Sequence, residues 1–460
     1  MRLTYPLMPA FTGALLLFSA CTFDPSGLGT EGETAPGSSS GDASTSTGEP
    51  LDPTTGVGST TGGEETTGPE TTTTGVTCAD GCPPTVGWTR IGEHGEGVGA
   101  ALVVDAFGDV VVAGDKMQGT DPTLRNIWTG KFRGETGAPV WEMGRGGNAK
   151  RDDFARAITL DVDGTVVVAG SLHETDKGKA DVWVAWLAPG SGDVNAESNL
   201  GTTDWDDGDA ELDEWARAVA FHPNGDLLVA GDRCVRPCEV PDAWVGRYTA
   251  TGEVVWDLPM LPFGPGAVRG LVAKDEGLVF VGTDGHANSM SPWRSRIRQL
   301  NATGGGTWSA LPESGFEEDS YEALAVALSP DGLLWVVGRT FLAEEPAGGF
   351  IRVYDPAVDV MPVAELAGED LNGSAWSVAV IDGGALVGGA VGERLWFARY
   401  DPTLAEVWRI EAEAGPDMPF VARGLAVDSA GDTLVLGAIA PKSRNEGERL
   451  WLRKYVAAGP

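Results

Sequence analysis

The sequence ARAITLDVDGTVVVAG, residues 155–170, indicates the fold of most of this chain. An apolar run from Ala155 leads to the turn Asp163-Gly164, and a β-branched run then ends at Gly170. Two strand-like runs around a turn whose glycine tolerates positive φ are typical of a β-hairpin. We therefore expect this stretch to form two adjacent antiparallel strands.

Variants of this hairpin recur to the C-terminus, and each copy ends in a glycine. The closing glycines are Gly114, Gly170, Gly231, Gly282, Gly338, Gly389 and Gly437. They are separated by 56, 61, 51, 56, 51 and 48 residues. A period near fifty with this much β-branched and turn chemistry predicts an all-β propeller of small antiparallel sheets.

Most copies continue with two further strand-like runs after the closing glycine. A Trp-led alternating run such as DVWVAWL from Asp181 comes first, and a run such as VWEMG from Val140 is typical of the last. Four runs make one four-stranded blade, packed between two neighbours. The seven predicted blades cover about 98–144, 154–201, 215–259, 267–312, 322–368, 375–413 and 421–456.

The two ends of the array predict how the ring closes. The seventh copy stops after its third run, LWLRKY from Leu450, whereas GWTRIG at 87–92 resembles a fourth strand without a blade. If residues 86–92 pair with the last blade, the ring is closed and no exposed strand edge remains. The alternative is an open array with a frayed end.

The N-terminus predicts export and a lipid anchor. Residues 1–20 read as a signal peptide, with Arg2 before a largely apolar stretch that is too short for a confident membrane-spanning helix. Residues 17–21, LFSAC, resemble the lipobox of bacterial lipoproteins, with Phe18 in place of the usual leucine. The resemblance implies diacylation of Cys21, and Thr22 then favours an outer-membrane lipoprotein, on the periplasmic side or at the cell surface. An ordinary cleaved signal peptide is the alternative.

Residues 21–77 predict a flexible spacer between this anchor and the propeller at 78–460. The segment consists largely of Gly, Ser, Thr, Pro and Glu, as in GSTTGGEETTGPETTTTG. Such a composition buries too little apolar area to offset the entropy of ordering. The chain carries a net charge of −35, which argues against nucleic acid as a partner and favours a soluble, monomeric body.

The remaining cysteines form two C-x3-C pairs, Cys78 with Cys82 and Cys234 with Cys238. In an oxidising compartment this spacing favours two small disulfide loops, although spacing alone does not prove the pairing. A zinc site built from all four thiolates is the alternative.

Two resemblances concern the repeats themselves. The hairpin with its D-x-x-G turn is similar to bacterial β-propeller repeats of secreted and surface proteins, which share a fold more than an activity. TGAPVW at 136–141 and TGEVVW at 251–256 resemble the tryptophan-docking motif of quinoprotein-type propellers. That likeness implies blade-to-blade packing here, because the chain lacks the adjacent cysteines that usually lie against the quinone.

The first strands supply candidate ligand-binding residues. Four of them carry an arginine at the same position, namely Arg156, Arg217, Arg269 and Arg423. Around the mouth of a central channel, four cations would receive an anionic ligand. The alternative is structural, because Asp153 and Glu214 lie three residues before Arg156 and Arg217 and would form local ion pairs.

A second candidate is the acidic loop DWDDGD at 204–209. Calcium prefers hard oxygen ligands such as Asp204, Asp206, Asp207 and Asp209. The glycine is not where an EF-hand loop requires it, so a solvated acidic loop is the alternative. Trp205 would stack on a sugar or peptide, or would simply cover the loop.

These features favour a non-catalytic, lipid-anchored propeller that binds a protein or glycan partner. No G-x-S-x-G element, phosphate-cradling loop or metal-ligand histidine spacing is present, so we nominate no catalytic residue and no cofactor other than Ca²⁺. The alternatives are a propeller enzyme, either a quinoprotein-like oxidoreductase or a glycan-active hydrolase or lyase, and a structural lipoprotein of envelope assembly.

Overall fold

A computed structural model describes most of the chain after residue 81. The described residues are 82–92, 97–118, 121–147, 150–174, 179–200, 212–235, 241–258, 266–275, 277–284, 294–310, 319–342, 345–357, 360–368, 370–412, 419–439 and 448–458. Within these ranges every helix or strand that forms is a β-strand, so no helix able to cross a membrane is present there. The predicted signal peptide (1–20), Cys21 and spacer lie outside the described residues.

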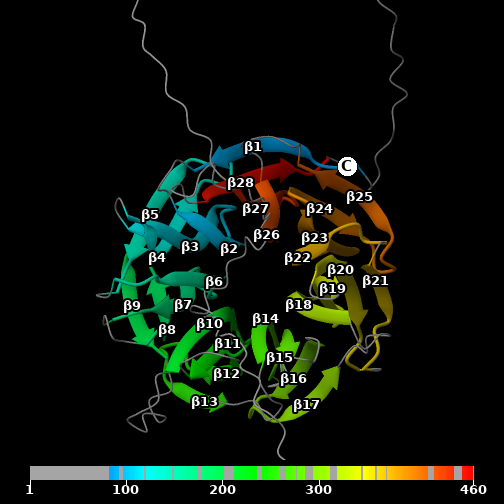
Figure 1. The fold of residues 1–460 in the computed structure, drawn as a ribbon. Helices are drawn as coiled ribbons and strands as arrows, with labels where there is room; N and C mark the ends of the chain where they lie inside the picture. The colour runs from blue at the N-terminus through cyan, green and yellow to red at the C-terminus, as the bar shows by residue number, and fades with distance from the viewer. Residues whose placement is uncertain are drawn as a thin grey trace, which may run out of the picture. The chain divides into compact units, whose positions relative to one another are not determined.

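The strands form seven four-stranded antiparallel sheets arranged in a ring (Figure 1). From the innermost strand outward, blade 1 contains β2 (Val98–Val104), β3 (Val110–Gln118), β4 (Asp121–Phe132) and β5 (Pro139–Arg145). Blade 2 contains β6 (Phe154–Leu160), β7 (Val166–Leu172), β8 (Asp181–Leu187) and β9 (Val194–Asn199). Blade 3 contains β10 (Leu212–Phe221), β11 (Leu227–Val235), β12 (Asp242–Tyr248) and β13 (Val254–Leu258).

The remaining blades repeat this order. Blade 4 contains β14 (Gly266–Lys274), β15 (Gly277–Asp284), β16 (Arg294–Asn301) and β17 (Gly306–Ala310). Blade 5 contains β18 (Asp319–Leu328), β19 (Leu334–Leu342), β20 (Glu345–Tyr354) and β21 (Ala364–Gly368). Blade 6 contains β22 (Ser374–Ile381), β23 (Gly384–Val391), β24 (Arg394–Tyr400) and β25 (Glu406–Glu411). Blade 7 contains β26 (Pro419–Val427), β27 (Thr433–Ile439), β28 (Arg449–Val456) and β1 (Thr85–Ile91).

The fourth strand of blade 7 comes from the N-terminus, which confirms the predicted closure. β1 pairs antiparallel with β28, so that Ile91 lies opposite Trp451 and Trp88 lies opposite Lys454. β1 covers the outer edge of β28, as Figure 1 shows. The ring therefore joins the two ends of the folded body by strand pairing, which leaves β28 no free edge.

The hairpin of blade 2 matches the sequence prediction and explains its residues. Asp161 accepts hydrogen bonds from the backbone N–H groups of Asp163, at 2.9 Å, and Thr165, at 2.7 Å. Gly164 has φ +81, a conformation that costs glycine little and other residues much. The Asp side chain and the glycine together hold the turn between β6 and β7.

A bulge explains the closing glycine. Ala155 pairs with Gly170 and Ala157 with Ala169, so Arg156 is an extra residue on β6. A Cβ on Gly170 would lie 1.8 Å from the carbonyl oxygen of Phe154. Glycine is therefore required opposite the bulge, because the bulged strand approaches too closely for any side chain.

Tryptophans of the third strands fill the space between blades. Each stands opposite a closing glycine in the strand register, and none is more than 3% exposed. These residues are Trp128, Trp183, Trp244, Trp396 and Trp451. The alternating Trp-led run thus contributes its largest side chain to the core, where burial of each aromatic ring stabilises the fold by about 2–3 kcal/mol.

In blades 1, 3 and 7 a tryptophan of the fourth strand connects the blade to the next. Trp141 of β5 donates a hydrogen bond from Nε1 to the carbonyl oxygen of Pro189 in blade 2, at 3.1 Å. A Cβ on Gly192 would lie 2.5 Å from the Trp141 ring, so the ring packs directly on that glycine. Trp88 and Trp256 donate in the same way to the following blades, at 2.9 and 2.8 Å. The tryptophan-docking element therefore acts in packing between blades.

Between blades 5 and 6 the docking tryptophan is replaced by alanine, and the glycine that it would pack on is replaced by leucine. Blade 5 carries Ala364 at the position of the docking tryptophan, opposite Val353. In blade 6 the turn position occupied elsewhere by glycine is Leu404, which has φ +64 and is 7% exposed. Leu404 and Ala364 belong to the same apolar cluster, so a leucine fills the space that the missing indole would occupy. Its burial compensates for an unfavourable backbone conformation.

Candidate functional site

The bulge of blade 2 is repeated on the innermost strand of every blade. Each of these strands has a register shift one residue after the partner of the closing glycine. The extra residues, in blade order, are Ala100, Arg156, Arg217, Arg269, Leu324, Trp376 and Arg423. They form a ring on the seven strands that surround the propeller axis (Figure 1), and we call this set the bulge ring.

The bulge ring lies near one end of the propeller. In each innermost strand the bulge residue comes four or five residues before the strand ends, and hairpin turns such as Asp163-Gly164 follow that end. We call the end that carries the bulge ring the loop face, and the end with the hairpin turns the turn face. A bulge re-aims the side chain that it carries, and in this ring the seven copies present arginine, alanine, leucine or tryptophan.

The four predicted arginines occupy equivalent positions, but their carboxylate partners differ from the expected ones. Arg156 lies 3.4 Å from Asp115, measured between Nη1 and Oδ1, and Arg125 of β4 binds the other oxygen of that carboxylate. Asp115 belongs to blade 1, immediately after its closing glycine. The expected partner, Asp153, accepts backbone N–H groups from Gly147 and His173, both at 2.7 Å. Asp153 therefore fixes the loops next to β6.

A chain of alternating charges continues across the next blades. Arg217 lies 2.9 Å from Asp232, and Arg269 of blade 4 lies 3.6 Å from the same Oδ2 atom. Arg269 also contacts Glu322 of blade 5 at 3.1 Å, and Arg339 contacts the other oxygen of Glu322 at 2.6 Å. Arg217 thus pairs with Asp232, on the second strand, rather than with the expected Glu214.

The fourth arginine closes this arrangement on the other side of blade 1. Arg423 of β26 lies 2.8 Å from Glu448, and both side chains are 14% exposed. Burial lowers the pKa of Arg125, but Asp115 and Glu448 raise it overall, so the charge of Glu448 acts on Arg125 of blade 1 as well as on Arg423 of blade 7. Arg423, Arg125 and Arg156 therefore gather around the innermost strand of blade 1.

Trp376 gives the bulge ring an aromatic member in blade 6. The guanidinium carbon of Arg339 lies 5.1 Å from the centroid of the Trp376 ring. Arg339 follows the closing glycine of blade 5, as Asp115 does in blade 1. The same inter-blade position therefore holds an ion pair in one place and a cation–π contact in another. Trp376 Nε1 donates to Ser374 Oγ at 2.8 Å, which fixes the indole.

The pKa of Arg156 is lowered by its surroundings. Burial lowers the pKa of its guanidinium to about 10, Asp115 opposes that shift, and repulsion from Arg217, Arg423 and Arg125 adds to it. A guanidinium stays protonated in proteins. The lowered pKa therefore reflects chiefly the burial of a guanidinium that has other cations nearby.

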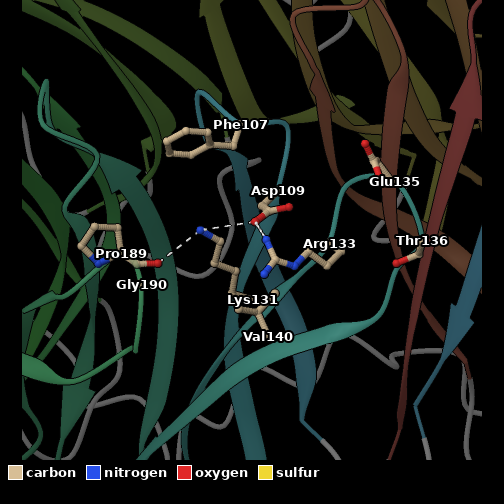
Figure 2. Close-up of a pocket in the computed structure, with 9 residues that line it drawn as sticks. All are labelled: Phe107, Asp109, Lys131, Arg133, Glu135, Thr136, Val140, Pro189 and Gly190. Atoms are coloured by element: carbon tan, nitrogen blue, oxygen red, sulfur yellow. Dashed lines mark hydrogen bonds and ion pairs between the residues drawn. The ribbon is translucent and has the colours of Figure 1, made fainter.

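A cavity of about 760 Å³ lies on the turn face, between blades 1 and 2 (Figure 2). Lys131 projects into it and binds Asp105 at 2.6 Å and the carbonyl oxygen of Pro189 at 3.2 Å. Lys131 also lies 3.6 Å from Asp109, and this ion pair recurs at equivalent positions as Arg247–Asp226 at 2.7 Å and Lys454–Asp432 at 3.0 Å. Because it is repeated in other blades, we assign this pair to the scaffold.

Several predicted site residues fall outside the described part of the chain. These are Cys21, Cys78, Cys238, Trp205, Asp204, Asp206, Asp207 and Asp209. Cys82 and Cys234 are described, and the pairing of the four cysteines stays a prediction. Within the described ranges, no group of three or more His, Cys, Asp or Glu side chains is arranged to hold a metal ion.

Comparison with known proteins gives distant propeller neighbours. No family model and no curated protein matches the chain. Among solved structures, the Dos1 propeller is 11% identical, with 81% of this chain and 95% of that chain covered and a TM-score of 0.49. BamB from Moraxella catarrhalis is 13% identical, with 82% and 92% covered and a TM-score of 0.41. Quinohemoprotein alcohol dehydrogenase from Comamonas testosteroni is 11% identical, with 82% and 77% covered and a TM-score of 0.47.

Proposed function

We propose that this protein is a non-catalytic binding module, anchored to the outer membrane through Cys21, whose loop face receives a protein or glycan partner. The bulge ring carries this proposal. Seven nearly identical hairpins place arginine, tryptophan, leucine or alanine at one position beside the axis, while the glycine opposite that position stays the same. Side chains that differ between copies while the frame around them stays the same are the usual carriers of binding specificity, because the frame only supports them.

The charge of the protein narrows the class of partner. A net charge of −35 opposes nucleic acids and other polyanions at long range. The arginines of the bulge ring supply positive charge only within a short distance of the axis. A partner with little overall negative charge that presents one acidic or hydrogen-bonding group to the loop face would avoid the long-range repulsion and still reach the arginines.

Crosslinking on intact cells tests the proposal. A photoreactive group at position 324, in the bulge ring, should capture a partner that the same group at position 162, on the turn face, does not capture. Leu324 is partly buried and Val162 is 99% exposed. Stronger crosslinking from position 324 could therefore not be explained by greater exposure, and would show that the partner binds the loop face. Capture from position 162 alone would contradict the assignment of the loop face.

Two further measurements separate this proposal from its alternatives. Incorporation of labelled fatty acid that is lost in a Cys21→Ser variant tests the anchor, and protease treatment of intact cells tells the cell surface from the periplasm. Dye reduction after addition of quinone and Ca²⁺, or turnover on a glycan array, would show that the protein is an enzyme and would contradict the proposed binding module. Co-purification with β-barrel proteins would favour a role in envelope assembly.

A further inference from the structure

Two large apolar side chains are exposed at neighbouring turns of the turn face. Phe107, in the turn between β2 and β3, is 90% exposed, and Val162, in the turn between β6 and β7, is 99% exposed. The turn-face loops of blades 1 and 2 are described in full and comprise residues 105–109, 133–138, 161–165 and 188–193. Both side chains therefore project from a completely described part of the surface.

The fold does not require an aromatic residue at position 107. In equivalent turns the residue before the glycine is Asp163, Asn224 or Asp331. Asp and Asn suit this position because they tolerate turn conformations and form local hydrogen bonds. The backbone N–H of Phe107 donates to Asp105 at 2.9 Å, a contact that a residue of another type would also make. The phenyl ring therefore adds apolar surface that the turn itself does not use.

The cavity between blades 1 and 2 lies beside Phe107 (Figure 2). Val140 and Pro189 contribute to its lining. Four charged side chains in and beside the cavity form ion pairs of 2.6–3.6 Å with one another, namely Asp105, Asp109, Lys131 and Arg133. The surface next to Phe107 is thus hollow and partly apolar, and these four charges are paired within it.

The chain enters the folded body on the same face. β1 begins at Thr85, which pairs with Val456 near the end of β28. The backbone N–H of Ala457 donates to Asp432, in the turn between β26 and β27, at 2.9 Å, so this end of blade 7 belongs to the turn face. Blade 7 adjoins blade 1 in the ring (Figure 1). The predicted spacer, residues 21–77, therefore joins the body on the turn face.

Such a spacer would hold the body close to a lipid anchor at its other end. A flexible chain of about 60 residues has a root-mean-square length on the order of 45 Å. Over such a distance the effective concentration of the body at the membrane surface is in the millimolar range, to order of magnitude. A contact made by only a few apolar side chains is then sufficient to keep one face of the body on the membrane.

We propose that the turn face of blades 7, 1 and 2 rests on a neutral phospholipid surface, with Phe107 and Val162 inserted among the headgroups. This inference rests on the proposed function, because the anchor supplies the proximity, and it directs the loop face away from the membrane. Val86 and Val456, at the turn-face end of blade 7, are 54% and 40% exposed and extend the contact. Apolar side chains that protrude from a surface gain free energy when they leave water for the interfacial region of a bilayer.

The charge of the turn face selects lipids without a net charge. Glu135, Asp163 and Asp193 are exposed on the turn-face loops of blades 1 and 2, and the whole chain carries a charge of −35. Anionic headgroups would be repelled over about 8 Å at physiological salt. A zwitterionic headgroup avoids this net repulsion, so the apolar contact is retained.

Co-sedimentation with phosphatidylcholine vesicles tests the proposal. The chain used starts at residue 21 and carries Cys21→Ser, so it lacks the predicted signal peptide and acyl chains but keeps every described residue. We expect the bound fraction to rise with lipid concentration in the millimolar range, and to fall when about one third of the lipid is phosphatidylglycerol. Salt at about 1 M should remove that difference, because the screening length is then about 3 Å.

A double variant tests the two side chains directly. Phe107→Asp combined with Val162→Asp should lower the partition coefficient at least about tenfold. Because both side chains are at least 90% exposed, the thermal unfolding temperature should not change. Ile91→Asp is the matched control, because Ile91 is 42% exposed and lies at the opposite, loop-face end of β1. This control should leave the partition coefficient unchanged.

The outcomes are decisive for the inference and separate from the proposed function. No binding to phosphatidylcholine vesicles, binding that the double variant retains, equal loss in Ile91→Asp, or tighter binding to vesicles with phosphatidylglycerol would overturn the membrane contact. In each of these cases, crosslinking from position 324 and fatty-acid labelling of Cys21 would still test the loop face and the anchor.

Discussion

Replacement of the docking tryptophan Trp141 should separate the contributions of its ring and its hydrogen bond. The Trp141 side chain is buried at 8% exposure, its ring packs on Gly192, and its Nε1 donates to the carbonyl oxygen of Pro189. Removal of a buried tryptophan ring costs about 3–5 kcal/mol, so Trp141→Ala should lower the free energy of unfolding by about 4 kcal/mol. Trp141→Phe keeps most of the ring and loses the hydrogen bond, so we expect a loss of about 1–2 kcal/mol.

Urea denaturation followed by far-UV circular dichroism measures both variants. Tryptophan fluorescence is less suitable, because the chain contains 16 tryptophans. Phe107→Ala is the control, since Phe107 is 90% exposed on the turn face and its replacement should change stability by less than about 0.5 kcal/mol. If Trp141→Ala were as stable as the native protein to within about 1 kcal/mol, the assignment of the fourth-strand tryptophans to blade docking would be refuted.

Three further changes test other parts of the fold. Leu404→Gly relieves a positive φ worth about 1 kcal/mol but removes a buried leucine worth about 2–4 kcal/mol, so urea denaturation should show a net loss of about 2 kcal/mol. Burial raises the pKa of Asp257 to about 6, repulsion from Glu214 adds to the shift, and Arg233 opposes it. The stability contributed by Asp257 is thus complete below its ordinary pKa of 3.8 and is lost as the pH rises through about 6. Asp257→Asn should therefore be more stable than the native protein at pH 7 but not at pH 4, and equal gains at both values would contradict the assigned pKa. Deletion of residues 82–92 removes β1 and exposes β28, so light scattering should detect dimers or larger aggregates, whereas a monodisperse monomer would mean that β1 does not protect that edge.

The sequence determined the repeating architecture because the information is local. Turn residues such as Asp161 and Gly164, β-branched runs and the Trp-led third strands specify hairpins and blades within about fifty residues. The seven copies, together with the orphan strand at 86–92, also predicted the number of blades and the way in which the ring closes. Hydrophobic periodicity and turn chemistry act over short distances, so they can be read without knowledge of the other blades.

The sequence also shows that Arg156, Arg217, Arg269 and Arg423 occupy the same position in their copies. It does not show which groups surround them. A bulge inserts one residue into each innermost strand, and no hairpin-level pattern shows which residue is extra until the strand register is known. Gly170 is the one trace of the bulge in the sequence, because the bulge requires a glycine opposite it. The glycine alone does not show which residue of the partner strand is extra.

Only the tertiary structure decided which charges meet around the axis. Asp115 and Arg156 are 41 residues apart and come from different blades, yet they form an ion pair, whereas Asp153, three residues from Arg156, binds backbone N–H groups. In the same way Arg339 meets Trp376 across the boundary between blades 5 and 6. These contacts depend on how neighbouring sheets are packed, because the residue that follows a closing glycine meets the bulge residue of the next blade. Local sequence specifies each blade, and the ring that the blades form together specifies the candidate site.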